Sequence, residues 1–523
     1  MTMFEKFGAG GLILIFICSG TILKTWGLDN DAWFILNCGR YVIETGTIPH
    51  TEFATIHEGL HFVMEQWLTA AIFWKIYSNF GADGLINFCW LVGVILLGIY
   101  YKLCLYVSSG NKKISALLSF GVGIIVIPLY IVTRPQIFST LILLVEVFLL
   151  EKYSRENKIW TLAILPVLSV IFINLHAALF PMMIIVLLPF LAESFLKKIL
   201  PLPLILTALA IILAGFVNPY GAEAMLFIFT SYDPEIHGNI GEVHPPTAVG
   251  FLGISFFAVA ALLIVTYSRK KLPWRYFFLT FGLMILASQA YRGIFLFLTL
   301  ATIPLAFAFK DWRPLDKKIN LPLKLFLPLF LVSVLEACEV FDDSILEMQL
   351  PLKILIVGAV IFLLCLWKKV TPLKVLAVAQ GIIILLALNL PVQSNDYEIY
   401  KPALNFLLKK YPAEKIILWT GFNSGGYAEF RGVKCYLDAR PEIFAKSNNH
   451  KADIIQEYFE LKRGELPYEE FFARYNFTHI FVTEDDMLVF QLLSRDKNYR
   501  QIFEYEFPSG DKKIRGKIFE PVK

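Results

Sequence analysis

The sequence predicts a polytopic α-helical membrane protein, with about thirteen spans and a C-terminal extracytoplasmic α/β domain. Of its 523 residues, 57% are hydrophobic and only 17% are charged, whereas about 25% of a soluble chain is charged. Apolar runs recur along residues 1–392, the predicted membrane domain. Residues 393–523 are instead charged and rich in turn formers, as expected of a domain outside the bilayer.

The predicted spans are apolar runs close to the roughly 20 residues that a helix needs to cross a bilayer. The first run follows a lone Lys6 and has no small-residue cleavage site after it, so we interpret it as an uncleaved span. The runs lie at 8–27, 84–106, 115–132, 136–151, 159–175, 177–196, 199–217, 249–267, 276–291, 294–309, 321–338, 352–367 and 374–391.

The distribution of basic residues predicts the orientation of the chain. Lysines and arginines gather in alternate loops, for example at Lys112-Lys113 and Lys197-Lys198, and the positive-inside rule assigns such loops to the cytoplasm. The N-terminus is then inside, and residues 28–83 form a large first external loop. Within it, we interpret 62–77 as an amphipathic helix on the outer surface, because counting it as a span would reverse the next basic loops.

The C-terminal segment shows an alternation of short strands and helices. Strand-like runs at 415–420, 434–437 and 479–483 are separated by helical patterns at 400–410 and 453–462. This order predicts a small α/β domain. The seven cysteines are scattered without paired spacing, which argues against a disulfide framework or a cysteine zinc site.

An acidic cluster, Asp29-Asn30-Asp31, directly follows the first predicted span. Ionisable groups at a membrane boundary are costly to dehydrate, so their presence favours catalysis or ligand binding over a mere helix end. Two residues that are two positions apart face different directions on a helix. We therefore expect one aspartate to act as a general base and the other to cap a helix beginning near Ala32, a position that suits Asp31.

The first external loop also contains the pattern His57-Glu58-Gly59-Leu60-His61, which matches the zinc-protease motif H-E-x-x-H. In that motif two histidines one helical turn apart bind zinc, and the glutamate activates water. Gly59 inside the motif and the lack of a third ligand at the usual distance count against a metalloprotease. The alternative is a polar turn whose histidines bind locally.

Two arginines lie at outer helix ends on the poorly charged side, Arg134 in Thr133-Arg134-Pro135-Gln136 and Arg292 in a very short loop. Basic residues on this side are exceptions to the positive-inside distribution, so we expect each of them to have an anionic partner. Arginine suits bidentate binding of phosphate, and the competing interpretation is an ion pair with a carboxylate of the first loop. The loop 218–247, which contains Glu242, is longer than a simple connector and favours a substrate-facing or lid segment.

Two motifs in the C-terminal segment have structural interpretations. Residues 421–427, Gly-Phe-Asn-Ser-Gly-Gly-Tyr, lack the lysine and spacing of a phosphate loop, so turn chemistry accounts for their glycines. In Leu437-Asp438-Ala439-Arg440-Pro441, pairing of Asp438 with Arg440 is the favoured interpretation.

The order of several short motifs resembles the GT-C superfamily of polyprenyl-phosphate-dependent glycosyltransferases, and within it bacterial membrane proteins related to the protein-mannosyltransferase group. A first span, an acidic motif, a large external loop, further spans and an external C-terminal domain follow one another as in that superfamily. The matching stretches are 29–33 (DNDAW), 46–49 (GTIP) with 52–53 (EF), 65–68 (EQWL), 133–136 (TRPQ), 174–176 (NLH), 218–221 (NPYG), 424–427 (SGGY) and 438–440 (DAR).

This resemblance implies an inverting transfer of a sugar from a polyprenyl-phosphate donor to an extracytoplasmic glycan, lipid or protein acceptor. Asp29 or Asp31 would be the base, and Glu52 stands where related sequences often have a second aspartate. Arg134 and Arg292 would stabilise the departing lipid phosphate.

The remaining expectations concern ligands and alternatives. We expect His57, His61, Glu65 and His176 to bind substrate. No cofactor is specified by these residues, a divalent metal is left open, and no nucleic acid partner is expected. A transporter of lipid-linked sugars or polysaccharide is the alternative function. It predicts internal repeats and charged residues deep in the spans, and the sequence has few of either.

Overall fold

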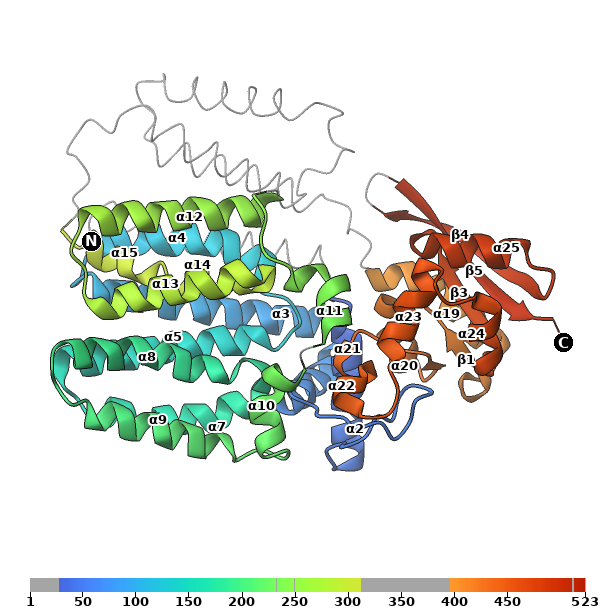
Figure 1. Cartoon of the computed structure of the whole chain (residues 1–523), viewed down its shortest axis with the longest axis horizontal. Helices are drawn as coiled ribbons and strands as arrows, with labels where there is room; N and C mark the ends of the chain where they lie inside the picture. The colour runs from blue at the N-terminus through green and yellow to red at the C-terminus, as the bar shows by residue number, and fades with distance from the viewer. Residues whose placement is uncertain (1–27, 232, 249, 312–395, 510–511, 523) are drawn as a thin grey trace, which may run out of the picture.

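The computed structural model describes residues 28–311 and 396–522, apart from 232, 249, 510 and 511. A bundle of long helices lies beside a domain that contains a β-sheet, and helix α2 (Asp31–Thr45) stands where the two meet (Figure 1). The predicted runs 8–27, 321–338, 352–367 and 374–391 lie outside the described residues.

The described helices of the bundle correspond to nine predicted spans. By length and apolarity, four stretches are sufficient to cross a membrane, Trp67–Val107, Ala177–Leu196, Leu252–Arg269 and Tyr291–Ala308; the total number of spans stays a prediction. The bundle consists of α3 (Trp67–Val107), α4 (Lys112–Tyr130), α5 (Gln136–Glu156), α6 (Trp160–Ala163), α7 (Leu165–Leu175), α8 (Pro181–Leu196), α9 (Leu202–Gly215), α12 (Gly250–Arg269), α13 (Trp274–Gln289), α14 (Ile294–Leu300) and α15 (Ile303–Ala308).

Helix α9 shows why these helices form a membrane domain. Its residues Leu202, Leu206, Leu209 and Leu213 are each more than half exposed, although they are large and apolar. Their spacing of three and four residues puts them along one face of the helix. A continuous exposed apolar face is unfavourable in water and is stabilised by contact with lipid.

The first external loop differs in part from the prediction. The surface helix expected over 62–77 begins only at Trp67, and it continues into the following span as one element, α3. A kink at Gly81, whose φ is 67°, joins the two halves. Glycine adopts this left-handed conformation without a steric penalty, so the chain changes direction there without a connecting loop.

Short elements connect the helices near the C-terminal domain. They are η1 (Ala177–Leu179), α10 (Ala222–Thr230), α11 (Pro234–Asn239), η2 (Gly241–Val243) and η3 (Tyr291–Gly293). The turns that follow α8 and α12 and carry basic residues lie at the opposite end of the bundle (Figure 1). This segregation agrees with the predicted sidedness, which stays a prediction.

The C-terminal domain has a five-stranded sheet with the order β2-β1-β3-β5-β4. Strands β1 (Ile417–Trp419), β2 (Lys434–Cys435) and β3 (His479–Thr483) are parallel, at the three places predicted. The antiparallel pair β4 (Tyr499–Ser509) and β5 (Lys512–Pro521) was not predicted. The helices are α19 (Asp396–Lys410), α20 (Phe422–Phe430), α21 (Pro441–Phe444), α22 (Lys446–Asn449), α23 (Ile454–Arg463), α24 (Tyr468–Arg474) and α25 (Met487–Arg495), with η4 (Ala413–Lys415) and η5 (Glu484–Asp486).

Helix α20 brings the C-terminal domain against α2. Gly425 and Gly426 lie within this helix and not in the turn that the sequence favoured. A Cβ at Gly425 would lie 1.9 Å from the carbonyl oxygen of Leu437, and one at Gly426 would lie 3.3 Å from the backbone nitrogen of Phe34. The glycines are therefore required for close packing, with α2 on one side and the segment after β2 on the other.

Candidate functional site

The acidic cluster forms the beginning of α2, with a division of roles that differs from the prediction. The helix begins at Asp31, so Asp31 is its first residue and not its cap. The backbone N–H of Asp31 donates a hydrogen bond of 2.9 Å to Oδ1 of Asp29. The Asp29 carboxylate therefore caps one of the free backbone amides at the start of the helix. The carboxylate of Asp31 does not have to serve as the cap.

Arg134 binds both aspartates. Its Nε lies 3.0 Å from Oδ1 of Asp29, and its Nη1 lies 3.2 Å from Oδ2 of Asp31. Nη1 also lies 3.5 Å from Glu242, and the neighbouring Thr133 hydroxyl accepts the N–H of Asp29 at 3.2 Å. For Arg134 the structure thus shows the competing interpretation, an ion pair with first-loop carboxylates.

The electrostatics of this cluster favour Asp31 as a base. The pKa of Asp31 is raised to about 7, mainly by burial; the positive charge of Arg134 opposes this increase, and the negative charges of Asp29 and Glu242 add to it. A carboxyl with a pKa near neutrality can take up a proton in a transition state and still be ionised in a useful fraction of molecules.

Glu65 and His176, two of the predicted substrate-binding residues, also lie close together. Oε1 of Glu65 lies 3.9 Å from Nε2 of His176, and its Oε2 accepts the N–H of Ala178 at 3.2 Å. The other ring nitrogen of His176 forms a 2.7 Å hydrogen bond with the buried hydroxyl of Ser139. Burial raises the pKa of Glu65 to about 8, so this side chain holds a proton at neutral pH.

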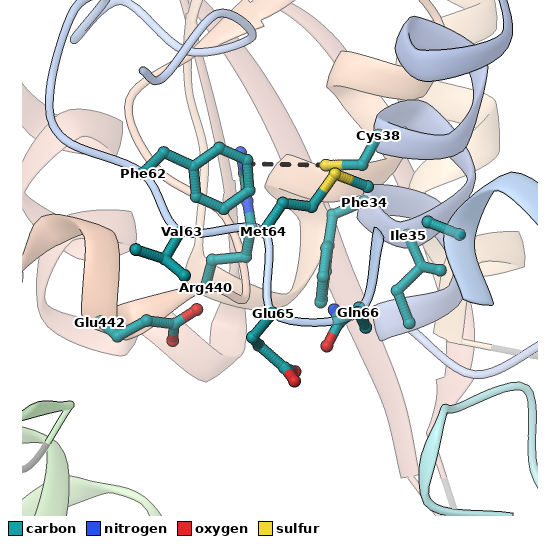
Figure 2. A pocket seen from close by; sticks show the side chains of 11 residues that line it. Phe34, Ile35, Cys38, Phe62, Val63, Met64, Glu65, Gln66, Arg440 and Glu442 are labelled. Carbon is teal, nitrogen blue, oxygen red and sulfur yellow. Dashed lines mark hydrogen bonds between the residues drawn. The ribbon is translucent and has the colours of Figure 1, made fainter. Parts of the chain in front are cut away.

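Glu65 lines a pocket between the first loop, α2 and the C-terminal domain (Figure 2). Its walls are mostly apolar, with a few polar side chains among them. The polar ends of Glu65, Gln66 and Glu442 point to the same side of the pocket (Figure 2). The lining residues are Phe34, Ile35, Cys38, Phe62, Val63, Met64, Glu65, Gln66, Ala70, Arg440 and Glu442.

Sequence reasoning missed Glu442, which belongs to α21 in the C-terminal domain. Burial raises the pKa of Glu442 to about 7. The signal available in the sequence was an acidic residue two positions after Arg440. Only the tertiary structure shows that α21 reaches the first loop.

Arg292 is the second predicted phosphate-binding residue, and its environment differs from that of Arg134. Arg292 is exposed and belongs to η3. In the same element, the backbone N–H of Tyr291 donates a hydrogen bond of 2.8 Å to the carbonyl oxygen of His244. Within the described part of the chain, its guanidinium makes no ion pair of 4 Å or less. Its positive charge lowers the pKa values of Glu65 and Glu442, so its electrostatic effect reaches two residues of the pocket.

Glu52 lies in a different, fully buried cluster. Its Oε1 accepts the N–H groups of Ala54 and Thr55 at 2.7 and 2.9 Å, and its Oε2 lies 3.0 Å from Nη1 of Arg440. Nε of Arg440 also donates to Asp438 at 2.7 Å, which confirms the predicted pairing of those two residues. Glu52 thus joins the first loop to the C-terminal domain behind the pocket wall.

His57 and His61, the two histidines of the H-E-x-x-H pattern, contact different residues. Gly59 has a φ of 80°, so the motif is not helical. The ring of His57 faces Tyr436 at 5.0 Å, whereas His61 lies 3.3 Å from Glu223. Among the residues that the structure describes, no group of three or more His, Cys, Asp or Glu side chains could hold a metal ion. The geometry of a zinc protease is therefore absent from this part of the chain, and His57 and His61 lie away from the pocket lining.

The fold matches solved glycosyltransferases. The archaeal oligosaccharyltransferase AglB from Archaeoglobus fulgidus, in complex with an inhibitory peptide and a dolichol-phosphate, has a TM-score of 0.57 at 11% identity, covering 100% of this chain and 75% of that one. ArnT from Cupriavidus metallidurans, bound to undecaprenyl phosphate, has a TM-score of 0.53 at 11% identity, covering 97% and 96%. No protein-family profile and no curated protein matches the sequence.

Both structures are GT-C superfamily polyprenyl-phosphate-dependent glycosyltransferases. The resemblance predicted from the order of short motifs is therefore confirmed at the level of the fold. The chain therefore shares the fold of these two structures, and its long apolar helices fit a multi-pass membrane protein.

Proposed function

We propose that this protein is a membrane glycosyltransferase that moves a sugar from a polyprenyl-phosphate donor to an extracytoplasmic acceptor, with Asp31 as the general base. The observation that carries the proposal is the paired aspartate cluster at the start of α2, a helix that also lines the pocket through Phe34 and Ile35. The positive charge of Arg292 acts on Glu65 and Glu442 in that pocket. The fold supports it, because AglB was solved with a dolichol-phosphate and ArnT with undecaprenyl phosphate.

The reaction balances as a single displacement. Asp31 takes the proton of an acceptor hydroxyl, whose oxygen forms a bond to the anomeric carbon of the sugar. The bond from that carbon to the phosphate oxygen breaks, and the lipid phosphate departs with the electron pair. Attack on the face opposite the leaving group inverts the configuration, and the positive charge of Arg292 stabilises the phosphate as charge develops on it.

The other predicted residues take supporting roles in this proposal. Arg134 is occupied by Asp29, Asp31 and Glu242, so it orients the acidic cluster and leaves the phosphate to Arg292. Glu65, whose side chain accepts a hydrogen bond from the N–H of Ala178, binds substrate in its protonated form. Glu52 is assigned a structural role, because it is buried and committed to Arg440.

The test is an incubation of purified protein and membrane extract with labelled polyprenyl-phosphate hexoses, followed by measurement of which label moves. Asp31→Asn is expected to lower transfer by ~10²–10⁴-fold, the usual contribution of a general base. Asp29→Asn should cost less, because its amide oxygen still accepts the N–H of Asp31. Asp311→Asn, at an exposed site, is the matched control. Full activity in Asp31→Asn would overturn the assignment of Asp31 as the base, and full activity in both Asp29→Asn and Asp31→Asn would remove the acidic cluster from the mechanism.

A further inference from the structure

We infer that Glu442 of the C-terminal domain completes, with Glu65 and Gln66 of the first loop, the subsite that binds the sugar of the lipid-linked donor. This inference rests on the proposed function and deepens it. It assigns to the C-terminal domain a direct contact with substrate.

The position of Glu442 is set by the buried residue that precedes it by two. Arg440 is only 2% exposed, and its guanidinium lies 3.0 Å from Glu52 and 5.1 Å from the centre of the Phe62 ring. Both partners belong to the first loop, so Arg440 fixes the start of α21 against that loop. Arg440 is thus a positioning residue, and Glu442 follows it into the pocket.

The pocket brings the two carboxyls to the place where a sugar would lie. The polar ends of Glu65 and Glu442 point to one side of the pocket (Figure 2). The positive charge of Arg292 lowers the pKa of both carboxyls. In the donor, the sugar is bonded directly to the phosphate. A phosphate held by Arg292 therefore places the sugar beside Glu65 and Glu442.

The chemistry of the pair suits a neutral, hydroxyl-rich group. Burial raises the pKa of both carboxyls, and the charge of Glu442 raises that of Glu65 further, so protonated carboxyl is present at neutral pH. A protonated carboxyl donates one hydrogen bond and still accepts others, and the amide of Gln66 does both as well. Sugar hydroxyls also donate and accept, whereas a second phosphate would be repelled by any ionised carboxylate.

The experiment compares two lipids, polyprenyl phosphate carrying a hexose and bare polyprenyl phosphate. Their dissociation constants are measured on full-length protein in detergent by ligand-induced thermal stabilisation. Glu442→Ala is expected to weaken binding of the glycosylated lipid ~10-fold, the effect of losing about one well-formed hydrogen bond, and to leave bare lipid phosphate unchanged. The KM for donor should rise accordingly. Glu442→Gln, which keeps hydrogen-bonding capacity, should lie between wild type and Glu442→Ala.

Glu414→Ala, on an exposed residue of η4, is the matched control and should bind both lipids like the wild type. The inference fails if Glu442→Ala keeps the wild-type preference for the glycosylated lipid, or if it weakens both lipids equally. A wild-type protein that neither prefers the glycosylated lipid nor transfers any sugar would overturn the proposed function itself. These outcomes are distinguishable because the first two are read from the variant and the last from the wild type.

Discussion

At the scale of single residues, the site depends on two arginines with opposite surroundings. Arg134 is held by three carboxylates, whereas Arg292 is exposed and its positive charge lowers the pKa values of Glu65 and Glu442. Their similar positions at outer helix ends predicted an anionic partner for each. The sequence left open whether that partner is a protein carboxylate or a ligand, because the choice depends on which loops fold over each helix end.

The pKa values of Asp31 and Glu65 predict a bell-shaped pH dependence. The base must be ionised, so kcat/KM is expected to fall as the pH drops through the pKa of Asp31, about 7. Glu65 must keep its proton to donate, so activity should also fall as the pH rises through about 8. Initial rates measured from acidic to alkaline buffers would show both limbs.

The control for this profile is Glu65→Gln, because a glutamine side chain does not titrate in this range. It should retain the acidic limb and lose the alkaline one. A wild-type rate that is constant through neutral pH would contradict the assignment of Asp31 as the base.

Residue-level prediction from sequence succeeded where chemistry is local. The pairing of Asp438 with Arg440 involves neighbours in the chain and was visible in the sequence. The acidic motif at 29–31 was equally visible, and its catalytic role stays a proposal. Glu442 was missed because its role depends on a contact with the first loop, almost 400 positions earlier. For the same reason, the burial of Glu52 under Arg440 was not visible.

At the scale of elements, α2 packs closely between α3 and α20. Gly39 makes the contact with α3, because a Cβ at this position would lie only 2.0 Å from the carbonyl oxygen of Ala70. Gly425 and Gly426 make the corresponding close contact on the α20 side. Since Asp31 begins α2, the packing of these glycines determines where the base lies.

Gly39→Ala is therefore expected to lower the free energy of unfolding by ~1–3 kcal/mol, the usual cost of forcing a group into a packed core. Gly98→Ala, in α3, is the matched control, since nothing lies within 4 Å of its added Cβ. Unfolding by denaturant in detergent, followed by tryptophan fluorescence, measures the difference. Equal stability of the two variants would show that α2 can shift away from α3 at no cost.

Element prediction worked best where one signal dominated. Long apolar runs gave the bundle helices, and short β-branched and aromatic runs gave β1, β2 and β3. The β4–β5 pair was missed because it is rich in charged residues, and its strands are held mainly to each other along one edge of the sheet. Tertiary pairing overrides weak local preference in such a case.

At the scale of the whole molecule, polar groups collect at the two ends of the bundle. One end carries the candidate site. The other carries a buried ion cluster in which Arg275 lies 2.7 Å from Glu151 and 2.9 Å from Glu193. This cluster ties α5, α8 and α13 together near the basic loops, and it fits the end that the positive-inside rule assigns to the cytoplasm.

The predicted sidedness can be tested by labelling intact cells with a membrane-impermeant maleimide. Glu414→Cys in the C-terminal domain should be labelled, because it is exposed and predicted to be outside. Lys158→Cys, exposed in the loop before α6, should be labelled only after the membrane is permeabilised. The wild-type protein measures the background, and its described cysteines are buried. The reverse labelling pattern would show that the topology is opposite to the predicted one.

The contact between Glu52 and Arg440 also has a consequence for biosynthesis. The two residues are 388 positions apart, so on the predicted topology Glu52 is exported while most of the chain is still untranslated. The Glu52 carboxylate stays hydrated until Arg440, in the last quarter of the protein, has been synthesised, because burial of the carboxylate without Arg440 would be strongly unfavourable. Assembly of the pocket is then one of the last events in folding, and a ribosome that stops before Arg440 releases an enzyme without a finished site.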